Sequence, residues 1–191
     1  LQANTTGAYN TAVGGNALDA NTTASYNCAF GSQALGGNTD GHSNNAFGYQ
    51  ALDGVVTGDY NNAFGRNALG ANTTGHSNTA IGQDSLQNNT TGNQNTAVGN
   101  SALAQSNATA NTAVGNDALV ANTSGADNVG VGRDTLTSTT TFKTDGESLT
   151  AIKHITASGV ITAQKIVTTQ FTASSVTSST IITEGSNIFG D

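Results

Sequence analysis

The sequence predicts an all-β fold, a parallel β-roll or β-solenoid of 17-residue repeats. The first observation is the phrase Asn-x-Ala-(Val/Phe/Ile)-Gly, which recurs with small variations from Asn10, Asn27, Asn44, Asn61, Asn78, Asn95, Asn111 and Asn128. The second is the spacing, which is 17 residues throughout except for one interval of 16. The third is that the apolar residues keep step with the phrase. A period this short indicates one structural rung stacked many times.

Two columns of apolar residues run through the repeats, and we expect them to form the interior. We count positions in each repeat from its Asn, which is position 0. Position +3 holds Val, Phe or Ile, and position +8 holds Leu in every repeat from Leu18 to Leu136. The sequence therefore predicts that the Val/Phe column and the Leu column both point inward.

A column of very small residues occupies position +2, which is Ala in seven repeats and Gly130 in the eighth. Side chains alternate along a strand, so this Ala column is expected on the face opposite the Val/Phe column. Small residues allow another backbone to approach closely. The Ala column therefore predicts contact with other subunits.

Glycine and asparagine mark the corners of each repeat. Gly at position +4 in all eight repeats predicts a corner that needs a positive φ or has no room for a Cβ. Turn-forming stretches near Asn21, Asn72, Asn89 and Asn122 predict a second corner, so each rung should contain two short strands and two turns. The Asn column at position 0 predicts a ladder of amides that hydrogen-bond along the axis, about 4.8 Å apart.

The repeat pattern stops after Leu136, which divides the chain into three predicted regions. Residues 1–136 form the β-solenoid, residues 137–147 a transition, and residues 148–191 a β-rich shaft or neck in which three chains intertwine. In the last region apolar residues recur every five positions, at Ile161, Ile166, Phe171, Val176 and Ile181. A pentapeptide-repeat coil would place small residues where Gln164 and Thr169 stand, so we favour the shaft.

Composition argues against several classes of partner. The net charge is −7, and only Arg66 and Arg133 are basic before residue 142, so no basic stripe can neutralise nucleic acid. No apolar run approaches the roughly 20 residues of a membrane-spanning helix. The single cysteine, Cys28, excludes a disulfide within the chain. The chain begins at Leu1 with what matches the end of a repeat, so we expect it to be a piece of a longer protein.

Catalysis is not expected from this sequence, and neither is a cofactor. An active site needs titratable groups gathered in a pocket, whereas the three His and twelve acidic residues are spread over a repeating surface. A glycan-cleaving solenoid would need clustered carboxylates for acid and base work. The acids at position +6, namely Asp84, Asp117 and Asp134, are better explained as an evenly solvated surface.

One column does bring titratable residues together. Position −2 holds His42, Asp59 and His76 in three successive repeats, so the carboxylate would lie about 4.8 Å from each imidazole. Such a column could bind a divalent metal or act as a pH-sensitive latch. The alternative, which we favour, is three solvated side chains on one loop face and no metal site.

Aromatic residues are the remaining candidates for ligand binding. Tyr9, Tyr26 and Tyr60 share position −1, while Tyr49 and Arg66 share position +5. Exposed aromatic rings on a rigid polar surface are typical of sites that stack on sugars. The alternative is that they pack against a neighbouring subunit.

Phrases such as Asn78-Thr-Ala-Ile-Gly82 and Asn95-Thr-Ala-Val-Gly99, joined by Ala-Leu and Asn-Thr-Thr-Gly, resemble the repeats of bacteriophage tail-fibre proteins. They are also similar to the head repeats of trimeric autotransporter adhesins, which are shorter. The resemblance covers residues 1–136. It implies a left-handed parallel β-roll, three copies of which pack around a common axis as the rigid part of an attachment fibre.

The resulting expectation is a trimeric fibre segment of a phage virion that contacts the host cell surface. Its partners would be two further copies of itself, other fibre or virion proteins, and a host surface glycan. The alternatives are the head of an adhesin on a bacterial cell surface, or an ice- or glycan-binding module. The ice-binding alternative lacks a regular Thr face, because position +1 varies among Thr, Cys, Asn and Val.

Overall fold

The structure is a computed structural model that describes residues 1–55 and 57–135, all within one compact unit. It contains eight strands of three residues each: β1 (Thr11–Val13), β2 (Cys28–Phe30), β3 (Asn45–Phe47), β4 (Asn62–Phe64), β5 (Thr79–Ile81), β6 (Thr96–Val98), β7 (Thr112–Val114) and β8 (Val129–Val131). The transition and shaft expected at residues 137–147 and 148–191 lie outside the described residues. In the described part of the chain there is no helix that could cross a membrane.

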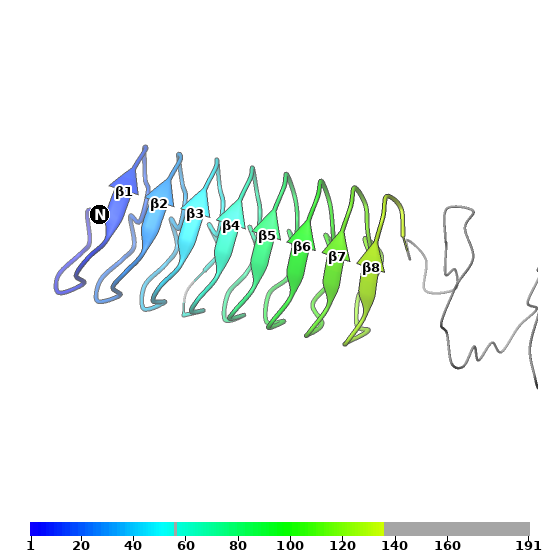
Figure 1. The fold of residues 1–191 in the computed structure, drawn as a ribbon. Coiled ribbons are helices and arrows are strands. Elements are labelled where there is room, and N and C mark those ends of the chain that lie inside the picture. The colour runs from blue at the N-terminus through cyan, green and yellow to red at the C-terminus, as the bar shows by residue number, and fades with distance from the viewer. Residues whose placement is uncertain (56, 136–191) are drawn as a thin grey trace, which may run out of the picture. The chain divides into compact units, whose positions relative to one another are not determined.

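The strands pair in parallel in chain order, from β1 to β8, in a single sheet (Figure 1). Each pair is in register with the repeat, so that Ala46 lies beside Ala63 and Phe47 beside Phe64. The 16-residue interval does not shift this register, because Ala97 still pairs with Ala113. The predicted parallel β-solenoid of 17-residue repeats is therefore confirmed.

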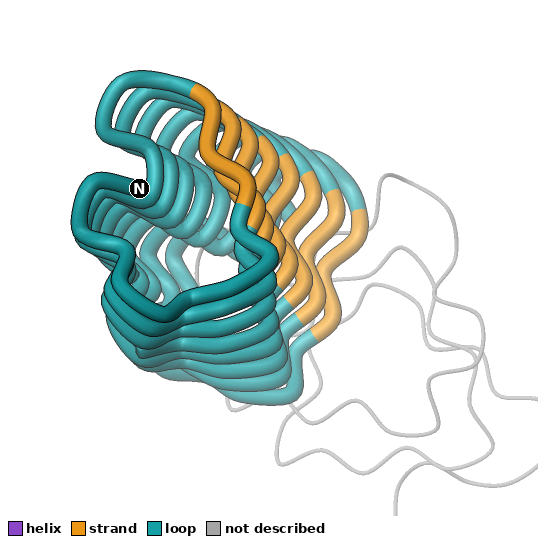
Figure 2. The backbone as a smooth tube through the Cα atoms, turned by 90° about the vertical axis from the view of Figure 1, so that its left-hand side faces the viewer, coloured by secondary structure: helices purple, strands orange, loops and turns teal. Residues whose placement is uncertain are grey.

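Each rung has one strand rather than the two expected. Seen along the axis, the strands form one side of the coil and loops and turns form the rest (Figure 2). The stretch from position +5 to the next Asn is held by backbone bonds between rungs. The N–H of Leu35 donates to the carbonyl of Ala51 at 3.0 Å, and the N–H of Leu52 donates to that of Ala68 at 3.0 Å. Residues at positions +6 and +8 have a left-handed backbone, as at Asn67 and Leu69, so this stretch does not form a second regular strand.

The interior differs from the prediction in one column. The Leu column is inside, with Leu18, Leu35, Leu52, Leu69, Leu86 and Leu103 fully buried. The Ala column, expected to be the contact between subunits, is also inside and packs with Leu in one core cluster. The Val/Phe column points outward instead, and Phe47 is 36% exposed. A coil this narrow has room for Leu from one wall only if the facing wall carries Ala, since interiors are close-packed.

Many residues adopt a left-handed backbone. Gly at position +4 has φ between 120° and 145° in all eight repeats, and a Cβ at Gly65 would also collide with the carbonyl oxygen of Gly82. The predicted corner is therefore confirmed: glycine is needed there both for its positive φ and because a Cβ would not fit. Leu at position +8 is left-handed too, with φ of 53° at Leu69. A bulky residue there costs about 1–2 kcal/mol, which burial of the Leu side chain offsets.

Asparagine satisfies the buried backbone. At position 0, the N–H of Asn44 donates to Oδ1 of Asn27 at 2.9 Å, and Nδ2 of Asn44 donates to the carbonyl of Gly58 at 2.7 Å. The side-chain amides also bond to one another, since Nδ2 of Asn61 donates to Oδ1 of Asn44 at 3.2 Å. These Asn side chains are fully buried from Asn44 to Asn111, as a buried amide can be only when its partners are in place. The predicted amide ladder is confirmed.

A second amide column, at position +11, is interrupted twice. Nδ2 of Asn38 donates to Oδ1 of Asn21 at 3.1 Å, and Nδ2 of Asn89 donates to Oδ1 of Asn72 at 3.2 Å. Val55 and Ser106 stand in the column where Asn would continue it. Oδ1 of Asn89 is buried without a hydrogen-bond donor, because position 106 carries no Asn and the N–H of Gly92 donates to Oδ1 of Asn107 instead, at 3.3 Å.

In the 16-residue rung, a side-chain oxygen takes the place of a backbone carbonyl, and this keeps the rung in register. In a full rung, a backbone carbonyl accepts hydrogen bonds from N–H groups at the corner of the preceding rung. The carbonyl of Thr90, for example, accepts from the N–H of Thr73 at 2.9 Å and from that of Thr74 at 3.1 Å. In the short rung, Oδ1 of Asn107 accepts from the N–H of Thr90 at 3.0 Å and of Thr91 at 2.8 Å. The side-chain oxygen of Asn107 thus does the work of the backbone carbonyl, so this rung can be one residue shorter and still stack on its neighbours.

Candidate functional site

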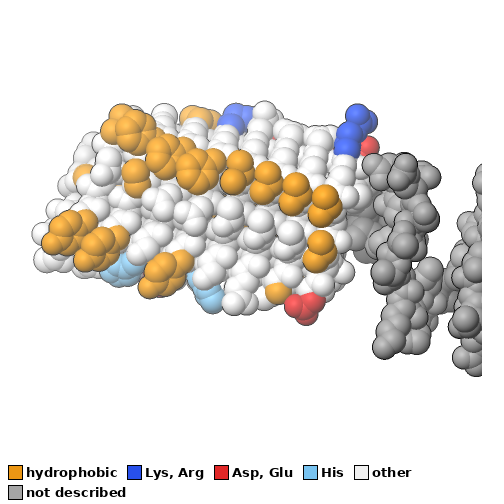
Figure 3. Space-filling model, viewed as in Figure 1, with side chains coloured by type: hydrophobic (Ala, Val, Ile, Leu, Met, Phe, Trp, Pro, Cys, Tyr) orange, Lys and Arg blue, Asp and Glu red, His pale blue; other side chains and the backbone are white. Residues whose placement is uncertain are grey.

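The most extended surface feature is the outward-facing column at position +3, which we call the outer ladder: Val13, Phe30, Phe47, Phe64, Ile81, Val98, Val114 and Val131. Seven of these side chains are between 36% and 66% exposed, and Val98 is half-buried. The ladder is the continuous hydrophobic band that crosses the molecule in Figure 3. Monomeric proteins seldom expose a contiguous apolar surface of this length, and such surfaces mark interaction sites.

The rings within the outer ladder are ordered. Phe30 and Phe47 stack with centroids 5.6 Å apart, and Phe47 and Phe64 stack 4.9 Å apart, with interplanar angles of 5° and 6°. The stack holds the three rings in one orientation. The ladder is therefore a rigid apolar edge that another molecule can meet with little loss of side-chain entropy.

The same face of the sheet carries neutral polar groups beside the ladder. Position +1 is occupied by Thr, Asn or Cys28 up to β7, and Nδ2 of Asn45 donates to Oδ1 of Asn62 at 2.9 Å. Neither position +1 nor position +3 carries a charge in any repeat. A partner can cover this face without burying an unpaired ion, which would be costly.

The tyrosines at position −1 form a second exposed surface. Tyr9, Tyr26 and Tyr60 are 77%, 60% and 63% exposed, respectively. The rings of Tyr9 and Tyr26 stack with centroids 5.0 Å apart and planes 11° apart. All three have left-handed φ, between 57° and 64°, because position −1 is left-handed in every repeat. Asn, Asp or Gly adopts this conformation most easily, so the backbone does not explain why Tyr occurs there.

The position −2 side chains act as hydrogen-bond acceptors for the preceding rung. The N–H of Ser25 donates to Nδ1 of His42 at 3.0 Å, and the N–H of His42 donates to Oδ1 of Asp59 at 2.7 Å. Asn93 accepts from the N–H of His76 in the same way, at 2.9 Å. Sequence reasoning missed this role, although the signal was present, since the column from Ser25 to Thr109 contains only residues with a side-chain acceptor.

The metal hypothesis gains no support from this geometry. The carboxylate of Asp59 is directed to a backbone N–H, and Nδ1 of His76 lies 3.4 Å from Oγ of Ser77. Across residues 1–55 and 57–135, no three His, Cys, Asp or Glu side chains are grouped so that they could hold a metal ion. The structure brings His42, Asp59 and His76 onto successive rungs, as expected, but without joining them in one site.

The residues at position +5 are not joined in one site either. Tyr49 is 48% exposed. Nη2 of Arg66, on the next rung, forms an ion pair with Oδ2 of Asp84 at 3.2 Å. An exposed pair of this kind contributes at most about 1 kcal/mol to stability. Arg66 is thus bonded to an acid of the rung that follows, away from Tyr49.

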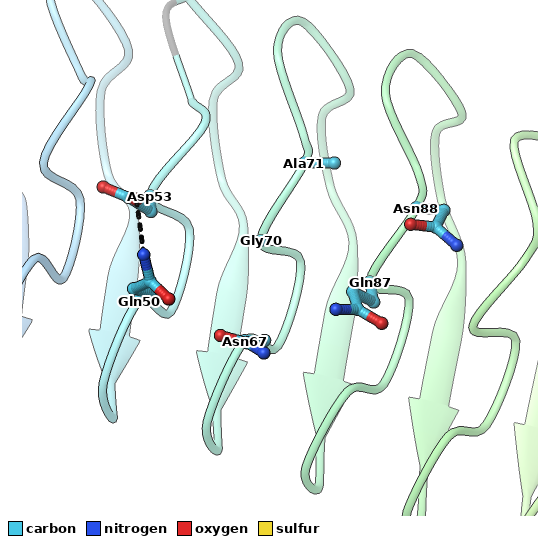
Figure 4. A pocket seen from close by; sticks show the side chains of 7 residues that line it. All are labelled: Gln50, Asp53, Asn67, Gly70, Ala71, Gln87 and Asn88. Atoms are coloured by element: carbon cyan, nitrogen blue, oxygen red, sulfur yellow. Dashed lines mark hydrogen bonds between the residues drawn. The ribbon is translucent and has the colours of Figure 1, made fainter.

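A shallow polar hollow lies on another part of the coil (Figure 4). Its volume is about 240 Å³, and its lining consists of Gln50, Asp53, Asn67, Gly70, Ala71, Gln87 and Asn88. It exists because Gly70 has no side chain between Asp53 and Gln87, which occupy the same position in the neighbouring repeats. Burial raises the pKa of Asp53 above 3.8, and a hydrogen bond from Gln50 opposes this in part.

Comparison with known proteins identifies no family for this chain: no family model, no curated protein and no solved structure matches it. Any assignment of function therefore depends on the surfaces described above.

The surface that sequence reasoning missed is the outer ladder, which was assigned to the interior. A signal for it was present. Position +2 is never larger than Ala, whereas position +3 varies from Val to Phe. A close-packed interior holds side-chain volume nearly constant from rung to rung, and a surface does not need to. The column of variable size is the one outside.

Proposed function

We propose that this chain is a rigid structural segment of a homotrimeric attachment fibre, of the type found in phage tail fibres, and that it belongs to the virion. The observation that carries the proposal is the outer ladder, an uncharged apolar edge that runs through all eight strands of the solenoid. The ladder takes over the assembly role that the sequence had assigned to the Ala column. No catalytic step is part of the proposed role.

Burial of the ladder favours association by an amount comparable to its entropic cost. Covering the remaining exposed part of each side chain contributes about 1 kcal/mol per rung, or roughly 8 kcal/mol per chain over the ladder. Association costs on the order of 4–15 kcal/mol in lost translational and rotational freedom. The two are comparable, so a ladder of eight rungs can hold chains together where one of two or three rungs could not.

The geometry favours cyclic symmetry around an axis parallel to the solenoid. The ladder runs along the stacking direction, so chains that meet along it in parallel retain the same polarity and can all continue into the same neighbouring segment. A twofold axis perpendicular to the solenoid would reverse one chain and prevent this. Three chains around one axis satisfy the requirement and form closed interfaces.

The mass in solution tests the proposal. Light scattering after size exclusion should give three times the chain mass of 19.0 kDa. Phe64→Glu should reduce this to one chain while keeping the β-sheet circular dichroism, since Phe64 already points outward. Asn88→Glu adds the same charge at an exposed position far along the rung from the ladder and should leave the trimer intact. A folded wild-type monomer at micromolar concentration would contradict the proposal.

A further inference from the structure

The row of tyrosines contains a gap of one rung. Tyr9, Tyr26 and Tyr60 occupy position −1 of the first, second and fourth repeats, and the third repeat has Ser43 there. Ser43 has a φ of 58°, the same left-handed backbone as Tyr26 and Tyr60. The backbone therefore continues unchanged through the gap, and only the ring is missing.

The width of the gap follows from the stacking distances of the chain. Rings on adjacent rungs lie 4.9 to 5.6 Å apart in the three stacks of this structure. Tyr26 and Tyr60 are separated by two rungs, so a slot about 10 Å wide, at about 4.8 Å per rung, separates their rings. A ring placed midway would lie about 5 Å from each tyrosine, within the range in which ring centroids interact favourably.

Tyr26 and Tyr60 differ from Tyr9 because they border the slot. One face of Tyr26 is covered by Tyr9, at 5.0 Å. Its other face is turned toward the slot, on whose far side Tyr60 stands. Both rings keep more than half of their surface exposed. The slot thus has an exposed tyrosine on each side.

The groups around the slot can bind hydroxyls. Nδ1 of His42 accepts from the backbone N–H of Ser25, so the proton of the neutral imidazole is on Nε2, which is a donor. Oδ1 of Asp59 accepts from the N–H of His42, which leaves Oδ2 as an acceptor. The hydroxyl of Ser43 can do either. Figure 3 shows hydrophobic side chains interleaved with histidines along one edge of the described solenoid.

We propose that Tyr26 and Tyr60 sandwich one neutral pyranose ring, with Ser43 below it and His42 and Asp59 bonded to its hydroxyls. A pyranose has apolar C–H faces and a rim of hydroxyls, which matches two aromatic walls and a polar base. Its chair is thicker than a flat aromatic ring, which suits a slot of two rungs. The site rests on the attachment role proposed above and gives that role a class of ligand, a surface saccharide.

Saturation-transfer difference NMR on the full chain tests the site. The probes are methyl β-D-galactopyranoside and methyl α-D-glucopyranoside, with sorbitol as a control that has hydroxyls but no ring. At least one pyranoside should show transfer to its ring C–H protons, and sorbitol should show none. Transfer to sorbitol as strong as to both pyranosides, or transfer to neither pyranoside, would overturn the proposal.

Three variants separate the slot from the rest of the row. Tyr60→Ala and Ser43→Tyr should abolish the signal, the first by removing a wall and the second by filling the slot with a ring. Tyr9→Ala should keep it, because Tyr9 lies outside the slot. A signal that survives both Tyr60→Ala and Ser43→Tyr would overturn the proposal.

The mass of each variant in solution distinguishes failure of the saccharide site from failure of the fibre proposal. Tyr60→Ala should retain the mass of the wild type. If it instead dissociates the assembly, the tyrosines are subunit contacts and the saccharide site is wrong, whereas the fibre proposal stands. If wild-type chains are monomeric but bind a pyranoside through Tyr60, the fibre proposal fails and the site stands.

Discussion

Ala63 and Phe64 are adjacent in β4 and lie on opposite sides of the wall of the solenoid. Ala63 is fully buried against the Leu column, and Phe64 is 40% exposed on the outer ladder. The inner columns of Leu, Ala and Asn scarcely vary along the repeats, whereas the outer ladder changes between Val, Phe and Ile. The comparison teaches that positions with the same residue in nearly every repeat are confined to the interior of this chain. Positions whose residue varies from repeat to repeat form a surface that is available for partners.

The strongest test of this comparison is a charge on the inner side. Ala63→Glu would bury an unpaired carboxylate among Leu and Ala, which costs several kcal/mol and exceeds what the neighbouring rungs can offset. We expect loss of the β-sheet circular dichroism at 25 °C. Phe64→Glu, one residue away, should keep the sheet signal. Equal loss from both variants would show that the two sides of the wall do not differ.

A cavity on the inner side should have the next largest effect. Leu69→Ala removes a fully buried side chain and should lower the free energy of unfolding by about 2–5 kcal/mol. Ile81→Ala removes a similar volume from the outer ladder and should cost less within one chain. Urea titration of both variants in the Phe64→Glu background measures the difference without the contribution of association.

The interrupted amide column offers a smaller, stabilising change. Ser106→Asn places a donor beside the unpaired Oδ1 of Asn89 and should raise the free energy of unfolding by about 1 kcal/mol. Val55→Asn fills the other interruption of the same column. There the amide oxygen of Asn38 already accepts from the N–H of Gly41 at 3.1 Å, so this variant should lose the burial of Val55 and destabilise. Stabilisation by both variants would contradict this explanation.

The smallest effect is expected at the polar hollow on the outside. Burial raises the pKa of Asp53 above 3.8, so ionisation favours the unfolded chain. The penalty is absent well below pH 3.8, grows as the pH rises through the folded-state pKa, and is constant above it. Asp53→Asn should therefore raise the melting temperature slightly at pH 7 and not at pH 3. Asp127→Asn, at an exposed position, is the control, and an equal gain from it would remove the burial explanation.

The sequence by itself determined the stacking of the chain. The interval between Asn residues set the register of every strand pair, and the invariant Gly at position +4 identified a corner that no other residue can occupy. The Leu column was assigned to the interior correctly, and the Asn column was correctly predicted to be an axial ladder of amides. These features depend only on residues at equal positions lying above one another, which any stacked repeat enforces.

Only the tertiary structure decided which face of the strand points inward. Alternation along a strand establishes that Ala63 and Phe64 point in opposite directions, but not which of them faces the interior. That depends on the distance to the opposite wall, which carries Leu69. The left-handed backbone of Leu69 helps to set this distance, and the sequence did not predict it. The coil closes too tightly to hold Phe and Leu together, so the small residue lies inside and the ladder remains for a partner.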